Sequence, residues 1–252
     1  MISTNTLDLG RQELSKERDE TLLFGGIKLR NKLDVIVGLF VAVLLISNLA
    51  SSAKIVMLGP FVYDGGTLLF PLSYIFGDIL TEVYGYKCAK RTIWIGFLAS
   101  LLMAATVWGV GLLPGETEWS IRVGQQAYDN VLSATLRIVI ASLVAYLAGS
   151  FANSYILARL KVMTQGRWLW IRTIGSTVVG QAIDTLLFVL IAFAFAEGFS
   201  PSMLISIIVS NYLFKVGIEV LFTPLTYAVT DWLKRSESID VFDTHSDFNP
   251  FS

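Results

Sequence analysis

The chain has 252 residues, of which 54% are hydrophobic and only 15% are charged. A typical soluble domain has about 25% charged residues, so this composition predicts a protein whose main solvent is lipid. The net charge of −1 gives no bias towards nucleic acid. The single cysteine and the single histidine, Cys88 and His245, exclude a disulfide framework, a Cys/His metal site and a Cys–His or Ser–His catalytic pair. No cofactor is expected.

The N-terminal region, residues 1–32, mixes basic and acidic side chains. It contains no short apolar core followed by a small-residue cleavage site, so a cleavable signal peptide is not expected. We predict a soluble, flexible tail here. Residues 233–252 form a polar C-terminal tail, in which His245 is expected to be solvated.

Between the tails, the sequence predicts an all-α integral membrane domain over residues 33–232. A helix needs ~20 mostly apolar residues to cross the bilayer. Six stretches qualify, at residues 35–52, 67–83, 92–113, 131–157, 173–195 and 203–229. A further apolar stretch at 55–63 is too short to cross. We favour an outer loop on the bilayer surface for it over backbone that enters a water-filled mouth.

The basic residues between these spans test the count independently. Alternate segments hold six, three, four and two Lys or Arg, whereas the segments between them hold one, one and none. Basic residues favour the cytoplasmic side of a membrane. The alternation therefore predicts six spans with both termini in the cytoplasm. Six spans can also divide into an inverted 3+3 repeat, a plan that many transporters use.

Six charged side chains interrupt the predicted spans. They are Arg137 and Lys215 among the bases, and Asp78, Glu82, Asp184 and Glu219 among the acids. Each ionised group near the bilayer centre costs ~2.5–3.5 kcal/mol, so these groups must pair, hydrogen-bond, change protonation or face water. Three of them, on different spans, fall near mid-depth, where transporters usually bind substrate.

Polar residues on three spans recur at intervals of three or four and therefore share a helix face. They are Tyr74, Asp78 and Glu82 on the second span, Gln181 and Asp184 on the fifth, and Asn211, Lys215 and Glu219 on the sixth. Lys215 and Glu219 are expected to be able to pair within their own helix. The remaining acids then outnumber the cations, which suggests a ligand that donates hydrogen bonds, or protonation during the mechanism.

Other positions complete the candidate site. Phe70 and Tyr74, one turn apart, are candidates for stacking on a flat ligand, although packing is as good an interpretation. Asn48 and Asn153 are interpreted as residues that hydrogen-bond between helices, and Asn48 is kept as a candidate ligand residue. The small residues around Gly180 favour close helix packing.

Several stretches together resemble the queuosine-precursor transporter family, within the vitamin uptake transporter group. They are Ser47-Asn48-Leu49 leading to Lys54, FPLSYIFGDILTEVYGYK at 70–87 followed by Lys90-Arg91, Gly180-Gln181-Ala182-Ile183-Asp184-Thr185 with Arg172 upstream, NYLFKVGIEVLFTPLTY at 211–227, and the ending Asp247-Phe248-Asn249-Pro250-Phe251. The resemblance covers residues 33–252. It implies uptake of a 7-deazaguanine, chiefly 7-cyano-7-deazaguanine, across the bacterial inner membrane for queuosine synthesis in tRNA modification.

The residue types agree with such a ligand. A deazaguanine edge presents two adjacent donors that one carboxylate can accept, a carbonyl that needs a donor, and a flat face for an aromatic ring. We expect Asp184 to accept the two donors, because Glu219 would occupy Lys215. The expected partners are the deazapurine and lipid, with no nucleic acid and with a homo-oligomer left open.

Two other functions remain open at this point. A binding subunit that needs a separate energising complex is compatible with six spans. An intramembrane enzyme with an Asp78–Asp184 dyad is disfavoured, since no nucleophile–base set or metal site accompanies the pair. No catalytic residue is therefore assigned.

Overall fold

The computed structural model describes residues 22–24, 27–29, 32–58, 61–132, 136–194, 200–244 and 246–251. The chain divides into two compact units, Met1–Leu39 and Phe40–Ser252. In the first unit, strands β1 (Leu22–Phe24) and β2 (Ile27–Leu29) pair antiparallel, and helix α2 begins. Most of the predicted N-terminal tail, and His245, lie outside the described residues, so the expected flexibility and solvation stay predictions.

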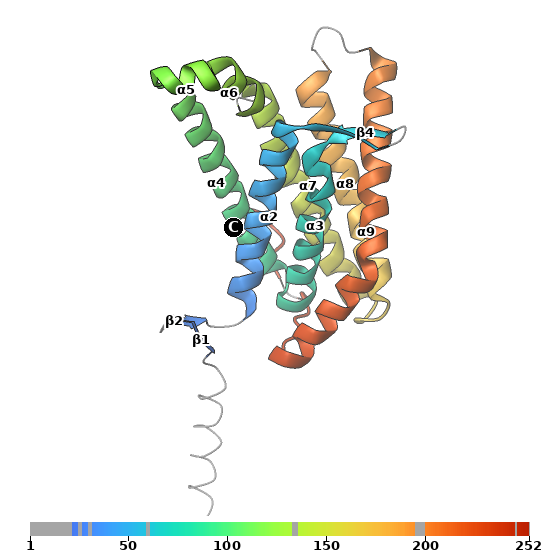
Figure 1. Ribbon diagram of the computed structural model, residues 1–252. Coiled ribbons are helices and arrows are strands. Elements are labelled where there is room, and N and C mark those ends of the chain that lie inside the picture. The colour runs from blue at the N-terminus through green and yellow to red at the C-terminus, as the bar shows by residue number, and fades with distance from the viewer. Residues whose placement is uncertain are drawn as a thin grey trace, which may run out of the picture. The chain divides into compact units, whose positions relative to one another are not determined.

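Five helices in the described part of the chain are long and apolar enough to cross a membrane. They are α2 (Lys32–Ala53), α4 (Tyr86–Gly111), α7 (Leu136–Met163), α8 (Leu169–Phe193) and α9 (Pro201–Glu237). Figure 1 shows them as the long ribbons of the structure. They correspond to the first and to the third to sixth predicted spans, which agrees with a multi-pass helical membrane protein.

The second predicted span, at 67–83, has a different form. It is divided into a 3₁₀ turn, η1 (Gly65–Leu68), the short helix α3 (Phe70–Ile79) and a π-helical turn, η2 (Leu80–Tyr84). At 1.5 Å per residue, α3 and η2 together are about 22 Å long, which is shorter than the ~30 Å of bilayer hydrocarbon. The count of six full-length spans therefore stays a prediction.

The short apolar stretch at 55–63 forms most of a β-hairpin. Strands β3 (Ile55–Leu58) and β4 (Phe61–Asp64) pair antiparallel, so this segment is extended backbone that satisfies its own hydrogen bonds. The Tyr63 ring stacks on Phe214 of α9, with ring centroids 4.8 Å apart. Below, the hairpin end is the end of the bundle that carries β3–β4, and the tail end is the opposite one, where α9 stops (Figure 1).

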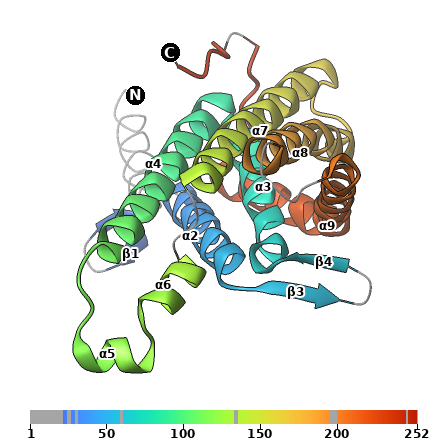
Figure 2. The same cartoon turned by 90° about the horizontal axis from the view of Figure 1, so that it is seen from above.

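Helix α3 lies among the other helices of the second unit. Figure 2 shows it between α7, α8 and α9, beside the Phe40–Ala53 part of α2. A buried core of Phe40, Leu44, Ile93 and Tyr146 joins α2, α4 and α7. Gly96 permits this contact, because a Cβ at that position would lie 2.5 Å from the Tyr146 hydroxyl oxygen.

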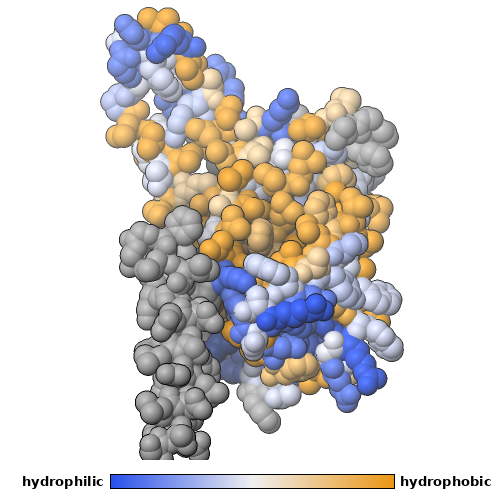
Figure 3. All heavy atoms as spheres, turned by 60° about the horizontal axis from the view of Figure 1, so that its bottom comes forward, coloured by the Kyte–Doolittle hydropathy of each residue, from blue (hydrophilic) through white to orange (hydrophobic). Residues whose placement is uncertain are grey.

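The outer surface of the helices is strongly apolar. Figure 3 shows a broad hydrophobic area over them, with polar residues gathered towards the tail end. Leu98, Leu102, Leu213 and Leu221 are all more than half exposed. Such an area would be unstable in water, and lipid chains satisfy it. Two short helices, α5 (Thr117–Arg122) and α6 (Gln125–Leu132), follow α4 at the hairpin end and have no buried residues.

The C-terminal segment after α9 packs back onto the helices. The Tyr86 backbone N–H, at the start of α4, donates to Asp243 Oδ2 at 3.0 Å, so a tail carboxylate caps this helix. The Trp94 indole N–H donates to the Pro250 carbonyl at 2.9 Å. The Phe248 ring lies 4.9 Å from the Tyr86 ring. The predicted polar tail is therefore an ordered part of the bundle.

Candidate functional site

A group of polar side chains occupies the interior between α3, α7, α8 and α9. Its members are Tyr74 and Asp78 on α3, Asn153 on α7, Gln181 and Asp184 on α8, and Lys215 and Glu219 on α9, and we call them the central cluster. All except Lys215 are buried. Polar groups from four helices are therefore buried in this interior, and their role as a substrate site stays a prediction.

Asp184 and Lys215 form an ion pair between α8 and α9. Lys215 Nζ donates to Asp184 Oδ2 at 2.8 Å, and it also lies 4.5 Å from the centre of the Phe70 ring. The expected pairing of Lys215 with Glu219 along α9 is therefore wrong. The neighbouring helix α8 supplies the carboxylate because its Asp184 faces α9, and the ammonium group gains an aromatic face as well. Asp184 is therefore not the free acceptor that the sequence suggested.

The buried carboxyl oxygens that still lack a hydrogen-bond donor within the described chain belong to Glu219 and Asp78. Asp78 Oδ1 accepts from the Asn153 amide at 2.6 Å. Asp78 Oδ2 and both carboxyl oxygens of Glu219 are buried and have no hydrogen-bond partner among the described residues. The helices that carry them, α3 and α9, pack against each other. With Asp184, three acids share this interior with one lysine, so the cluster has an excess of two carboxyl groups over cations.

Two further polar groups face the same interior. Within the described chain, the Gln181 amide has no partner at its nitrogen or at its oxygen, and the Tyr74 hydroxyl has none either. Tyr74 lies close enough to Asp78, Asp184 and Glu219 to experience their charges. The cluster therefore combines unpaired acceptors, an amide that can donate and accept, and an aromatic ring. That set suits a flat ligand with adjacent N–H donors and a carbonyl.

Close helix packing brings these groups together. A Cβ on Gly149 of α7 would lie 2.9 Å from the Gly180 carbonyl oxygen and 2.6 Å from the Tyr74 hydroxyl oxygen. A Cβ on Gly180 would lie 2.8 Å from the Asn153 Cβ. The sequence indicated this role for Gly180, but it gave no sign that Gly149 is the facing residue.

Glu82 lies in a second group of charges, one turn beyond Asp78 towards the tail end. We call Glu82, Lys161, Arg172, Lys234 and Asp240 the tail-end cluster. Arg172 Nη2 and Lys234 Nζ lie 2.8 Å and 2.7 Å from Glu82 Oε1, and Lys161 Nζ lies 3.7 Å from it. Asp240 bridges the two lysines at 2.5 Å and 3.0 Å. Burial of Asp240 acts to raise its pKa, but the hydrogen bonds and the positive charges of Lys161 and Lys234 together outweigh burial and lower the pKa.

Sequence reasoning placed all three cations of this cluster outside the spans, Lys234 among them. Lys161 and Arg172 were placed in the loop between the fourth and fifth spans, yet both are buried. Helices α7 and α8 extend past their apolar runs, so these side chains remain inside the bundle. Two features of the sequence were the available signal. Basic residues stand just beyond an apolar run, and an acid within another span, Glu82, needs a cation.

Three further polar residues of the predicted spans make no hydrogen bond to the central cluster among the described residues. The Asn211 amide donates to the Ile207 carbonyl of its own helix at 3.0 Å. Asn48 is half-buried on α2 and makes no hydrogen bond to the central cluster among the described residues. Arg137 Nε donates to the Ile191 carbonyl at 2.7 Å, which explains its place within an apolar helix.

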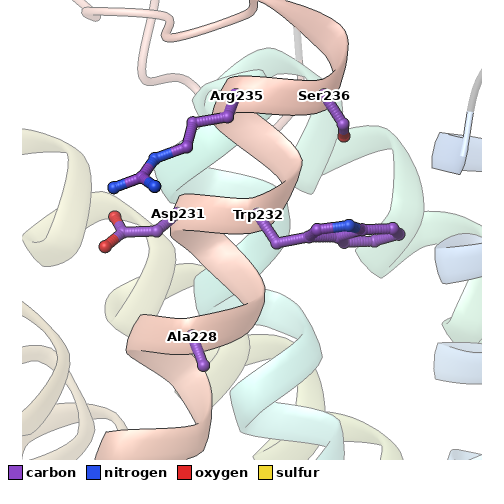
Figure 4. Close-up of a pocket in the computed structure, with 5 residues that line it drawn as sticks. All are labelled: Ala228, Asp231, Trp232, Arg235 and Ser236. Atoms are coloured by element: carbon purple, nitrogen blue, oxygen red, sulfur yellow. The ribbon is translucent and has the colours of Figure 1, made fainter.

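A surface hollow lies apart from both clusters, near the C-terminal end of α9. It has a volume of about 410 Å³ and is lined by Ala228, Asp231, Trp232, Arg235 and Ser236. Figure 4 shows the Asp231 and Arg235 side chains on one side of the helix and the Trp232 ring on the other. These side chains follow the surface of a single helix, so we do not assign a substrate site here.

Comparison with known proteins places the chain among transporters. A family model described as "Putative vitamin uptake transporter" matches residues 64–229. The "Probable queuosine precursor transporter" of Bacillus subtilis (strain 168) is 27% identical over 68% of this chain and 73% of that protein. The "Queuosine precursor transporter" of Escherichia coli (strain K12) is 28% identical over 73% of this chain and 79% of that protein.

No solved structure matches the chain. The matched region runs from the end of β4 to the Pro224-containing part of α9, so it includes every member of the central cluster. The chain therefore belongs to the putative vitamin uptake transporter family, which is a family of transporters and not of enzymes.

Proposed function

We propose that this protein imports a queuosine precursor, 7-cyano-7-deazaguanine or a related 7-deazaguanine, across the bacterial inner membrane. The names of the two bacterial relatives support the substrate class. The chemistry of the central cluster supports the base. Both termini lie in the cytoplasm in this proposal, as the distribution of basic residues predicts.

The observation that carries the proposal is the pair of unpartnered oxygens on Glu219. A guanine-type edge has a ring N–H next to an exocyclic amine, and one carboxylate can accept from both. Glu219 is buried and has no cation of its own among the described residues, whereas Asp184 already accepts from Lys215. Glu219 therefore replaces Asp184 as the proposed acceptor of the two donors.

The other members of the cluster provide the remaining contacts in this proposal. The Gln181 amide nitrogen donates to the ring carbonyl of the base, and its oxygen can accept from a further ring N–H. The rings of Tyr74 and Phe70, whose centroids are 5.8 Å apart, offer faces for stacking. Asp78 and Asn153 hold each other in place beside the ligand. Glu82, Asn48 and Asn211 stay outside the proposed binding residues.

The test compares two ligands that differ in one donor. We expect the purified protein to bind 7-cyano-7-deazaguanine and to bind the analogue without the exocyclic amine about 10–150-fold more weakly, because a bond to a charged acceptor contributes about 1.5–3 kcal/mol. Equal binding of the two ligands, or no binding of either, would contradict the proposal.

A binding subunit that needs a separate energising complex is the second candidate. It differs from a self-sufficient carrier in one measurement, uptake by liposomes that contain this protein alone. We expect accumulation or equilibration of the labelled base in such liposomes. Binding without any uptake would favour the subunit.

A further inference from the structure

The tail-end cluster joins five separate parts of the chain at one point. Its residues come from η2, α7, α8, α9 and the segment after α9, and each is held to at least one other by an ion pair. Lys161 also donates to the Glu82 and Val241 carbonyls. The Asp184–Lys215 ion pair of the central cluster, by comparison, joins only α8 and α9. Breaking the tail-end cluster would therefore release several helices from one another at once.

The tail-end cluster is buried on one side and exposed to solvent on the other. The side chains of Glu82, Lys161 and Arg172 are 1% exposed, whereas those of Lys234 and Asp240 are 21% and 44% exposed. A buried ion cluster is a poor way to maximise stability, because apolar packing of similar volume usually holds helices at least as well. Charged pairs that border on water can exchange their partners for water, which allows such a contact to open and close.

Buried hydroxyl side chains lie along the helices between the central cluster and the tail-end cluster. On α9 they follow Glu219 at steps of four, three and four residues, at Thr223, Thr226 and Thr230, and Lys234 comes four residues later. These steps place them on one face of the helix. On α8, Ser176 and Thr177 come between Arg172 and Gln181. In η2, Thr81 comes between Asp78 of α3 and Glu82. We call these six hydroxyl residues the polar seam.

Two members of the polar seam carry buried hydroxyls without a partner among the described residues, Thr177 on α8 and Thr230 on α9. Others bond to their own helices, as Thr223 does to the Glu219 carbonyl at 2.9 Å. Val would pack as well at the threonine positions, because it has the shape of Thr and no polar atom that needs a hydrogen bond. Buried hydroxyls that recur along helices between the two clusters suit a passage that admits water when the helices part.

Pro224 divides α9 within this region. Proline removes one backbone hydrogen bond of a helix and clashes with the preceding turn, so helices bend at such residues. Figure 1 shows the last part of α9 bent towards the tail end of α3. The part after Pro224 carries Thr226, Thr230 and Lys234, so its movement would open the seam and withdraw Lys234 from Glu82 together.

We propose that the tail-end cluster is a gate, and that the polar seam is the part of the transport route that it closes. This rests on the proposed function, because it places the substrate in the central cluster and its release at the tail end. In the proposed topology that end faces the cytoplasm. Arg172, Lys161, Lys234 and Asp240 then act in transport without touching the substrate.

The experiment measures access to the seam without substrate. A Cys88→Ser background carries Thr230→Cys as its only thiol, one turn inside Lys234. Inside-out vesicles are treated with a membrane-impermeant thiol reagent. We expect slow alkylation in this parent and alkylation faster by on the order of tenfold after Lys234→Ala, because loss of an ion pair that favours the closed state shifts the opening equilibrium. Arg235→Ala, next in sequence but outside the cluster, is the matched control and should leave the rate unchanged.

Asp240→Asn is a second variant of the same cluster and should act in the same direction, which covers the case that Lys234→Ala does not fold. Fast alkylation of the parent, or equal rates in parent and cluster variants that show the same thermal unfolding, would overturn the gate. Because no substrate is present, these outcomes do not depend on the identity of the transported base. Adding 7-cyano-7-deazaguanine afterwards tests that identity separately, through binding alone.

Discussion

Four buried carboxyl groups lie in the apolar helices, and their partners differ. Glu82 lies among three cations, Asp184 pairs with one lysine, Asp78 accepts from an amide, and Glu219 has no partner among the described residues. A buried charge is costly unless it is paired and hydrogen-bonded. The first two groups therefore serve to hold helices together, while Asp78 and Glu219 are left for a ligand or a proton.

Glu219→Gln should change stability and binding in opposite directions. Gln keeps the size of the side chain and removes an ionisable group that has no cation beside it, so the thermal unfolding temperature in detergent should rise or stay level. The amide replaces one acceptor with a donor that faces the donors of the base. Binding of 7-cyano-7-deazaguanine should fall by about 10–150-fold. A variant that binds like the wild type would remove Glu219 from the site.

The Asp184–Lys215 pair predicts energetic coupling that can be measured. Each of Asp184→Asn and Lys215→Met leaves a partner unpaired, whereas the double variant removes both groups. We expect a coupling of about 1–3 kcal/mol in the free energy of unfolding from this double-mutant cycle. A second cycle of Glu219→Gln with Lys215→Met is the control, and its coupling should be much smaller. Reversed magnitudes would favour the pairing along α9 that the structure contradicts.

At the scale of elements, the second hydrophobic segment is the unusual one. It passes from a hairpin through a 3₁₀ turn into a short α-helix and a π-helical turn. Interrupted segments of this kind often carry the binding sites of transporters, since irregular backbone is tolerated only where protein shields it. Here the short helix lies between longer ones (Figure 2), and its Tyr74 and Asp78 are buried.

The α7–α8 contact beside the central cluster should be sensitive to one added methyl group. Gly149→Ala places a Cβ within 3 Å of the Gly180 carbonyl oxygen and of Asp184 Cβ, so the helices must separate. Such overpacking costs about 1–3 kcal/mol. Gly217→Ala on α9 is the matched control, because no atom lies within 4 Å of its added Cβ. It should stabilise the helix by about 0.5–1 kcal/mol.

Thermal unfolding of the two glycine variants in the same detergent checks this prediction. Gly149→Ala should unfold at a lower temperature than the wild type, and Gly217→Ala at the same or a higher one. Equal unfolding temperatures would show that α7 and α8 can separate at little cost. The polar groups on α8 would then be positioned less firmly than the described contacts indicate.

For the molecule as a whole, the sequence predicted where the helices lie better than it predicted which charged side chains pair. Long apolar runs specify spans because length and hydropathy are local properties, and five of the six runs are long helices. The burial of Asp78 and Asp184 inside the bundle agrees with their predicted depth, whereas their shared role at a substrate site stays a prediction. Partner choice did not follow from the sequence, because it depends on which helices are neighbours. Asp184 rather than Glu219 takes Lys215 only because α8 faces α9 at that level.

The ends of the helices were the other weak point. Helix α9 continues eight residues beyond its predicted span, to Glu237, and α8 begins four residues before its own, at Leu169. Arg172 and Lys234 therefore belong to helices and not to loops. A span predicted from hydropathy ends at the first charged residue, whereas a helix continues as long as tertiary contacts pair that charge. The tail-end cluster supplies these contacts through Glu82.

The topology of the whole chain gives the last prediction. Alternating numbers of Lys and Arg predict that both termini lie in the cytoplasm. Helix α5 and the start of α9 both lie at the hairpin end, whereas the starts of α4 and α8 lie at the tail end (Figure 1). Single cysteines replacing Glu118 or Ser202 in a Cys88→Ser background should therefore react from outside intact cells with an impermeant thiol reagent.

Cysteines that replace Lys87 or Arg167, which are exposed at the tail end, should react only after the membrane is permeabilised. All four positions should react with a permeant reagent, which controls for burial of the thiol. The reverse labelling pattern would mean that the protein has the opposite orientation in the membrane, with the tail-end cluster on the outer face. The basic residues oppose that orientation, because the segments at the tail end carry most of them and would then face away from the anionic inner leaflet.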